Sequence, residues 1–226
     1  MIKHHPKYEL IQSFVNGDLP ASLSAAISIH ADMCPACQRH ISLLTDQVAE
    51  LSFEALSLTT ADDNLVNESI LNMDFEEMIA GITQSNEIDV KQVIEVKTVN
   101  FKSKPYNLPT ALNNINLGNV AQIGKLARTR LQLTENEIHT NLLHMEPGGS
   151  VPEHTHKGFE LTLLLEGSFH DNSGVYVKGD FIMRDGNHIH QPISDSGCLC
   201  YTVANDAMHF TQGINKLLNP IGSFIY

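Results

Sequence analysis

The residues best suited to chemistry near the start of the chain are two cysteines and a histidine. His30, Cys34 and Cys37 follow the pattern His-x-x-x-Cys-x-x-Cys. Two thiols separated by two residues can bind one ion across a tight turn, and His30 lies one helical turn before the first thiol. Zn(II) prefers four nitrogen and sulfur ligands in a tetrahedron, so a further ligand is needed, for which His4 and His5 are the candidates.

Two alternatives to a metal site are a redox Cys-x-x-Cys pair and two ordinary buried cysteines beside a capping histidine. A redox pair usually begins a helix that follows a strand. No strand pattern precedes Cys34. The ligand set therefore favours Zn(II).

Short helical patterns surround this group and would position it. Helices are predicted over residues 6–16 and 20–32, and a third from Pro35 onward. His30 is in phase with Leu23 and Ile27, so it faces inward with the apolar side chains. A core this small would be marginally stable without a cross-link, and a bound metal ion would supply one. A fourth, acidic helix is predicted over Asn64–Ile82, and it carries Asp74, Glu76 and Glu77.

The negative charge of the chain is concentrated in its first part. Residues 1–90 hold three basic and fourteen acidic residues, 3 − 14 = −11, of a net charge of −12. Such a charge repels nucleic acid and attracts a basic protein partner. A solvated acidic surface kept for solubility is the simpler alternative.

Several functional classes are disfavoured by composition. No apolar run approaches the roughly 20 residues of a membrane helix, and the first residues lack the apolar core of a signal peptide. We therefore expect a cytoplasmic protein with no membrane partner. The four cysteines occur in Cys-x-x-Cys and Cys-x-Cys pairs, which favours metal or thiol chemistry over a disulfide framework.

The second part of the chain reads as a β domain. The helical pattern lapses near residue 83, and we predict a helical domain over 1–85, a linker over 86–94 and a β domain over 95–226. Many short strands separated by Gly, Asn and Asp turns indicate an antiparallel sandwich or barrel. Strands are predicted at residues 93–101, 120–126, 140–145, 159–165, 175–177, 181–183 and 199–203.

This β domain carries a second group of metal-ligating residues. His154 and His156 point to the same face of a strand, and Glu160 can return to that face across the turn at Lys157–Gly158. A third histidine follows at His190, with His188 as a rival. Three imidazoles and a carboxylate in a small barrel predict a mononuclear site for Zn, Fe or Mn.

Cys198 and Cys200 alternate by two, so they share one face of a strand. They are candidates for oxidation or for joining the metal shell, although small cysteines in strands are more often ordinary core residues.

The β domain resembles the cupin superfamily. The first cupin motif, Gly-x5-His-x-His-x3–4-Glu-x6-Gly, is met in full from Gly148 to Gly167. The second is partial: Gly179 and His190 fit, whereas Asp185 stands in place of the usual proline, and Asn187 and Ser194 also depart from the pattern. The spacing favours His190 over His188.

A zinc-type helical module before a cupin resembles the ChrR family of zinc-dependent anti-sigma factors, over nearly the whole chain. The resemblance implies two domains, an all-α zinc domain and an all-β cupin barrel. It implies that His5 is the fourth ligand beside His30, Cys34 and Cys37, and that the N-terminal site holds Zn(II). It also implies a second metal at His154, His156, Glu160 and His190, with Zn(II) expected there and Fe or Mn as alternatives.

The family also implies a function. The helices would bind an extracytoplasmic-function sigma factor and block its binding to RNA polymerase. The cupin would sense an oxidative signal such as singlet oxygen or an organic peroxide. The main alternative is a cupin metalloenzyme, a dioxygenase or isomerase, with the helices as a regulatory or dimerisation module. A DNA-binding zinc module is disfavoured by the charge of −11 over residues 1–90.

Overall fold

The structure is a computed structural model that describes residues 1–59, 75–85, 96–102, 104–206 and 208–211. Its contacts form two compact units, Met1–Leu43 with Val96–Tyr226, and Leu44–Glu95. The first helices thus belong to the same unit as the β domain. The predicted linker 86–94 lies outside the described residues. A helical domain over 1–85 that folds separately from residues 95–226 stays a prediction.

The helices near the start of the chain follow the predicted pattern. The first unit contains α1 (Tyr8–Asn16), α2 (Ala21–Met33) and the beginning of α3 (Pro35–Thr59). Gly17 ends α1 in a left-handed conformation with φ of 77°. This geometry lets the N–H groups of Gly17 and Asp18 donate to the last free carbonyls of the helix. Pro35 begins α3, where the missing N–H of proline costs nothing.

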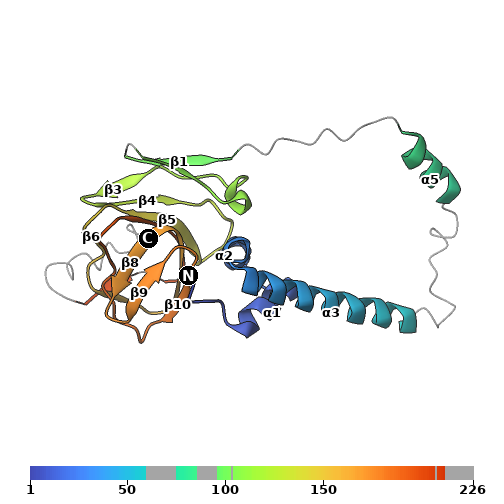
Figure 1. Ribbon diagram of the computed structural model, residues 1–226, viewed down its shortest axis with the longest axis horizontal. Helices are drawn as coiled ribbons and strands as arrows, with labels where there is room; N and C mark the ends of the chain where they lie inside the picture. Colours follow the sequence, from blue (N-terminus) through green and yellow to red (C-terminus); the bar gives the residue numbers. More distant parts are fainter. Residues whose placement is uncertain (60–74, 86–95, 103, 207, 212–226) are drawn as a thin grey trace. The chain divides into compact units, whose positions relative to one another are not determined.

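The strands form an antiparallel barrel (Figure 1). They are β1 (Thr98–Phe101), β2 (Lys104–Asn107), β3 (Ala121–Ile123), β4 (Leu126–Arg130), β5 (His139–Met145), β6 (Gly149–Ser150), β7 (His154–His156), β8 (Phe159–Asp171), β9 (Gly174–Val177), β10 (Phe181–Asp185), β11 (Ile193–Ser194), β12 (Cys198–Ala204) and β13 (Met208–Phe210). A 3-10 helix, η1, spans Thr110–Leu112. The single strand predicted over residues 120–126 is wrong, because Gly124 turns the chain with φ of 57° and creates the β3–β4 hairpin.

Strand β8 is the centre of the barrel. Its first half pairs with β10 and β12, and its second half pairs with β9 and β11. Leu161, Leu163 and Leu165 belong to the core shared with the helices. The alternate residues Glu160 and Thr162 line a cavity inside the barrel. Both faces of this strand are therefore covered, which explains the apolar run at residues 163–165.

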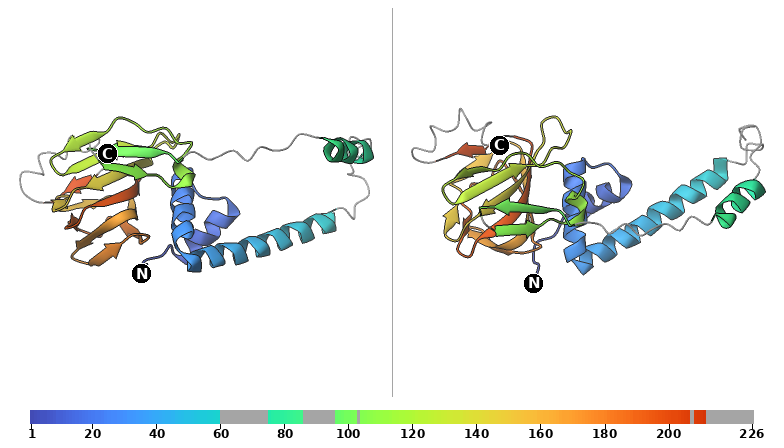
Figure 2. Two further views of the ribbon diagram at one scale, coloured as in Figure 1. Left: turned by 45° about the horizontal axis from the view of Figure 1, so that its top comes forward. Right: turned by 90° about the horizontal axis from the view of Figure 1, so that it is seen from above.

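Helix α2 packs against the outer face of the barrel (Figure 2). Leu23 and Ile27 of the helix join one buried core with Tyr201 and Val203 of β12. The phenolic O–H of Tyr201 donates to the carbonyl of Ser22 over 2.9 Å. The β barrel thus supplies much of the core that these short helices lack.

The second unit contains the rest of α3 and helix α5 (Phe75–Gln84). The helix predicted over Asn64–Ile82 is described only in this last part, since residues 60–74, including Asp74, lie outside the described residues. Phe75, Met78, Ile79 and Ile82 of α5 are exposed. Within the described part of the chain, no helix has the length and apolar character needed to cross a membrane.

Candidate metal centres

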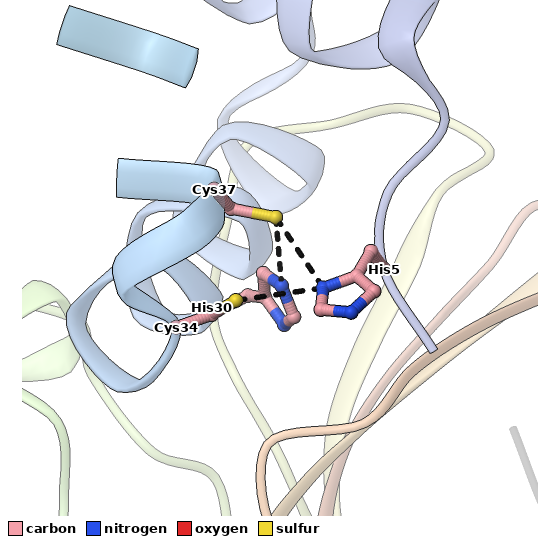
Figure 3. A group of neighbouring side chains, drawn as sticks. All are labelled: His5, His30, Cys34 and Cys37. Atoms are coloured by element: carbon pink, nitrogen blue, oxygen red, sulfur yellow. Dashed lines mark hydrogen bonds between the residues drawn. The ribbon is translucent and has the colours of Figure 1, made fainter. Parts of the chain in front are cut away.

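The first candidate centre brings together His5, His30, Cys34 and Cys37 (Figure 3). One ligand atom from each lies within 4.8 Å of all the others. His5 comes from the extended segment before α1, His30 from the last turn of α2, and the cysteines from the start of α3. His4, the other candidate, instead places its ring 4.9 Å from the ring of Tyr176.

The separations between the ligand atoms suit a tetrahedral ion. Nε2 of His30 lies 3.2 Å from Sγ of Cys37, and Nδ1 of His5 lies 3.4 and 3.5 Å from the two sulfurs. Around Zn(II), with its usual bond lengths, neighbouring nitrogen and sulfur ligands lie ~3.3–3.8 Å apart. These three separations are close to those expected around Zn(II).

The environment of this cluster favours uncharged ligands until a cation binds. Burial lowers the pKa of His30, so its imidazole is available as a neutral ligand. Burial also raises the pKa of the Cys37 thiol to about 12, helped by a hydrogen bond with Cys34. A bound cation would reverse this penalty, because it stabilises the thiolate directly.

The second candidate centre brings together His154, His156, Glu160 and His190, all buried inside the barrel. His154 and His156 lie on β7, Glu160 on β8, and His190 in an isolated bridge with His154. Oε2 of Glu160 lies 3.4 Å from Nε2 of His156 and 3.3 Å from Nε2 of His190. This arrangement offers three nitrogens and a carboxylate to one ion.

His154 has the features of a metal ligand. Its Nδ1–H donates to the carbonyl of Pro152 over 2.7 Å, which turns Nε2 toward the cluster. This buried Nε2 has no hydrogen-bond partner among the residues that the structure describes. Burial lowers the pKa of His154 to about 4, so the ring is neutral near pH 7. An unpaired, neutral imidazole nitrogen in this position fits a metal ligand.

Glu160 is charged despite its burial. Burial alone would raise the pKa of this carboxyl, but hydrogen bonds with His156 and His190 hold it well below its usual range. A buried carboxylate needs such partners or a metal ion. Among the four residues of this centre, Glu160 is the one that carries a negative charge to attract a cation.

Three residues around His190 were not expected from the sequence. Arg184 contacts Nδ1 of His190, pairs with Asp171 over 2.6 Å, and donates to the hydroxyl of Tyr176 over 2.8 Å. These partners hold the His190 ring from the side opposite the cluster. Arg184 follows Ile182 by two residues on β10, so the alternation of that strand placed its side chain inward. No local sequence pattern predicts that Asp171 and Tyr176 lie beside His190.

His188 lies outside the centre. Its side chain is 57% exposed and its Nδ1 lies 2.7 Å from a carboxylate oxygen of Asp185. The spacing argument that favoured His190 over His188 agrees with this geometry.

The cavity beside the second centre is small. Its volume is about 30 Å³, and its lining includes His154, Glu160, His190 and Cys200. A water molecule needs ~10–15 Å³ on this measure, whereas ligand pockets are typically ~300–1,000 Å³. The cavity has room for a water molecule beside the ligands and is far smaller than a typical ligand pocket.

Cys198 and Cys200 lie inside the barrel, with their sulfurs 3.9 Å apart. A hydrogen bond from Cys200 lowers the pKa of Cys198, and the same contact, together with burial, raises the pKa of Cys200. Their shared face is the one expected from the alternation of a strand. Cys198 is the more readily ionised of the two thiols.

The barrel with its His-x-His, Glu and His cluster defines a cupin. Residues 119–207 match the family model of the ChrR cupin-like domain. The chain is also 21% identical, over 97% of both proteins, to the anti-sigma-E factor ChrR of Cereibacter sphaeroides. Its fold matches the crystal structure of Rhodobacter sphaeroides SigE in complex with the anti-sigma ChrR, with a TM-score of 0.60 and 20% identity, covering 90% of this chain and 99% of the other.

The predicted resemblance to the ChrR type of anti-sigma factor is thereby confirmed, and so is the fold class of N-terminal helices followed by a cupin barrel.

Proposed function

We propose that this protein is an anti-sigma factor that binds an extracytoplasmic-function sigma factor and blocks its access to RNA polymerase. The observation that carries the proposal is the similarity to an anti-sigma factor over 97% of both chains, which includes the helices as well as the cupin. Sigma factors and RNA polymerase work in the cytoplasm, so we place the protein there. The charge of −11 over residues 1–90 supports a basic protein partner and opposes direct binding of nucleic acid.

Both clusters are proposed to hold metal ions. His5, His30, Cys34 and Cys37 would hold a structural Zn(II), since four protein ligands close its coordination shell. His154, His156, Glu160 and His190 would hold a second ion, for which Zn(II) is expected and Fe or Mn are the alternatives. A Zn(II) ion at the first cluster would fix the end of α2 against the start of α3, and so order the helices that bind the partner.

Helix α5 is the proposed contact with the sigma factor in the second unit. Phe75, Met78, Ile79 and Ile82 recur at helical spacing, and each is at least 44% exposed. Glu76 and Glu77 lie in the first turn of the same helix. An apolar stripe with acidic flanks suits a groove in a basic partner, in the manner of helix-in-groove recognition.

The cupin is proposed to sense the oxidant that releases the sigma factor. The centre of His154, His156, Glu160 and His190 shares its cavity with Cys200, whose sulfur lies 3.9 Å from that of Cys198. Two such thiols can reduce a hydroperoxide, forming a disulfide and releasing an alcohol and water. The cavity volume of about 30 Å³ supports a sensor of small oxidants over the alternative of a dioxygenase or isomerase.

A single purification can distinguish an anti-sigma factor from a cupin metalloenzyme. The full chain, purified from a native extract, should carry a sigma factor at near-equal amount, with zinc found by elemental analysis. A Cys37→Ser variant should lose zinc and sigma factor together, whereas Cys198→Ser, a thiol of the barrel, should keep both under reducing conditions. Iron with oxygen uptake and no bound sigma factor would refute the proposal. Undiminished capture by a zinc-free Cys37→Ser protein would refute the structural role of the ion.

A further inference from the structure

The turn between β9 and β10, residues 177–181, touches the N-terminal cluster directly. The carbonyl of Gly179 accepts a hydrogen bond from Nδ1–H of His30 over 2.7 Å. A carbonyl can only accept, so the proton of the neutral ring is on Nδ1 and the lone pair of Nε2 faces the sulfur of Cys37. A residue 149 positions away in sequence thus sets the tautomer and orientation of a candidate zinc ligand.

The same turn also fixes the segment that carries His5. One carboxylate oxygen of Asp180 accepts from the backbone N–H groups of Lys3 and His4, over 2.7 and 3.0 Å. The N–H of Phe181 donates in turn to the carbonyl of His4 over 3.0 Å. Asp180 is completely buried, and its other oxygen accepts from Val177 over 2.8 Å.

Gly179 allows this close approach. Its φ of 90° suits glycine, and a Cβ at this position would collide with the side chain of Ile2. The turn therefore holds the ligand segment through three backbone hydrogen bonds and through direct packing. Without these contacts, an extended segment at the chain start would have no regular structure to position His5.

A network of side-chain contacts leads from this turn to the second cluster. Strand β10 starts at Phe181, and its Arg184 stands opposite Glu160 of β8. The guanidinium of Arg184 contacts His190 and donates to the hydroxyl of Tyr176. The ring of Tyr176 lies 4.9 Å from that of His4, the residue before His5. Strand β10, the side chain of Arg184 and one ring contact thus join His190 to His4, which precedes the cluster residue His5.

We propose that the Gly179–Asp180–Phe181 turn is a positioning element shared by both centres and couples their metal affinities. An ion in the barrel fixes His190 and Glu160, and with them Arg184 and β10. This holds the turn in the geometry that His30 and His5 need. By thermodynamic reciprocity, each metal raises the affinity of the other centre by the same factor, ~5- to 150-fold for a typical coupling. The inference rests on both clusters binding metal and does not depend on any sigma factor.

Co(II) is a suitable probe, because thiolate-to-cobalt absorption reports the cluster that contains Cys34 and Cys37. The band is assigned by its loss in Cys34→Ser. Affinity is measured against a competing chelator in the full chain, in His154→Ala, in Asp180→Ala and in the double variant. His154→Ala, which empties the barrel, should weaken Co(II) binding at the distant thiolate cluster several-fold. Asp180→Ala should weaken it as well, and His154→Ala should then have little further effect.

The non-additivity is the decisive result, because a purely structural role of Asp180 would leave the effect of His154→Ala intact. Asp195→Ala, a carboxylate of the same barrel with 82% side-chain exposure, is the matched control and should change nothing. Asp180→Asn keeps the side-chain volume and replaces Asp180→Ala if circular dichroism shows that the latter is unfolded. Additive effects, or unchanged affinity in His154→Ala, overturn the coupling. Absence of any thiolate band in the parent protein overturns it together with the proposed zinc site.

Discussion

At the scale of single residues, His144 is a buried histidine outside the metal centres that should make the stability of the fold depend on pH. This histidine of β5 is buried and stacks on Phe101, with ring centroids 5.3 Å apart and planes 7° apart. Within the described part of the chain, its Nδ1 has no hydrogen-bond partner. Burial lowers its pKa below the ordinary value of 6.5, and the positive charges of Lys104 and Lys102 act in the same direction against the opposing Glu146 and Glu166.

The stability of the protein should therefore fall on acidification partly through His144. The folded-state pKa lies below the unfolded value, so as the pH falls the unfolded chain takes up the proton first. The stabilising contribution is complete above about pH 6.5 and is lost as the pH falls from there toward the folded pKa. His144→Phe keeps the stacking and removes the titration. Urea unfolding between pH 8 and 5.5 should show a smaller loss of stability in this variant than in the parent protein.

The exposed His188 supplies the control for this measurement. His188→Gln is measured beside it, because this ring is 57% exposed. A His144→Phe slope equal to that of the parent protein would show that the ring titrates alike in both states.

At the scale of elements, α5 shows an amphipathic helix whose apolar face is exposed in the described structure. Ile82 is 69% exposed and Ile79 is 55% exposed. Burial of one such side chain on binding contributes ~1.5–3 kcal/mol, or about tenfold or more in affinity. This helix is therefore where substitutions should separate partner binding from folding.

Ile82→Asp should weaken capture of the sigma factor by at least about tenfold, with unchanged circular dichroism. Ile123→Asp is the matched control, because Ile123 is 70% exposed on the β3–β4 hairpin of the other unit. Equal effects of the two substitutions would remove α5 from the interface.

Charge reversal tests the acidic side of the same helix. Glu76→Lys with Glu77→Lys should slow association with the sigma factor and weaken its dependence on salt, because long-range attraction is lost. Stopped-flow association at two salt concentrations measures both quantities. The partner role of Asp74 stays a prediction outside the described residues.

Some residues of the two candidate metal centres could be predicted from the sequence, and others could not. Spacing alone singled out His30, Cys34 and Cys37, because a helix and a tight turn bring nearby ligands together. It also singled out His154, His156 and Glu160 on adjacent strands. The hydrogen bond from His30 to Gly179 and the network of Asp171, Tyr176 and Arg184 had no such signal. They depend on tertiary packing between residues far apart in sequence, which local periodicity does not encode.

The division into compact units also depends on tertiary packing that the sequence pattern did not predict. Composition marked a change near residue 85, yet residues 1–43 pack with the barrel because α2 and β12 share a core. Leu23 and Ile27 of α2 indicated that a buried face exists, but not that Tyr201 would cover it.

At the scale of the whole molecule, the proposed function requires a chemical event in the barrel to release a partner bound elsewhere on the chain. Exposure of the purified complex to an organic hydroperoxide should release the sigma factor. Glu160→Gln should slow this release, since it removes the negative charge of a proposed metal ligand. Cys200→Ser should slow it only if the thiol pair is the reactive group.

Timed gel filtration of the complex measures the release. Cys200→Ser separates thiol oxidation from loss of the barrel metal, and elemental analysis of each fraction records whether metal leaves first. Release at the parent rate in both variants would place the sensor outside the barrel.

The hydrogen bond from Tyr201 to Ser22 joins residues 179 positions apart, and this has a consequence for synthesis on the ribosome. The four residues of the first cluster are all translated by residue 37, whereas the strand that covers α2 is among the last described elements to emerge. Translation proceeds at ~5–20 residues per second, so several seconds or more pass between synthesis of the helices and synthesis of the strand that completes their core. During that interval, the candidate metal ligands of the nascent chain are exposed before the barrel that orients them has formed.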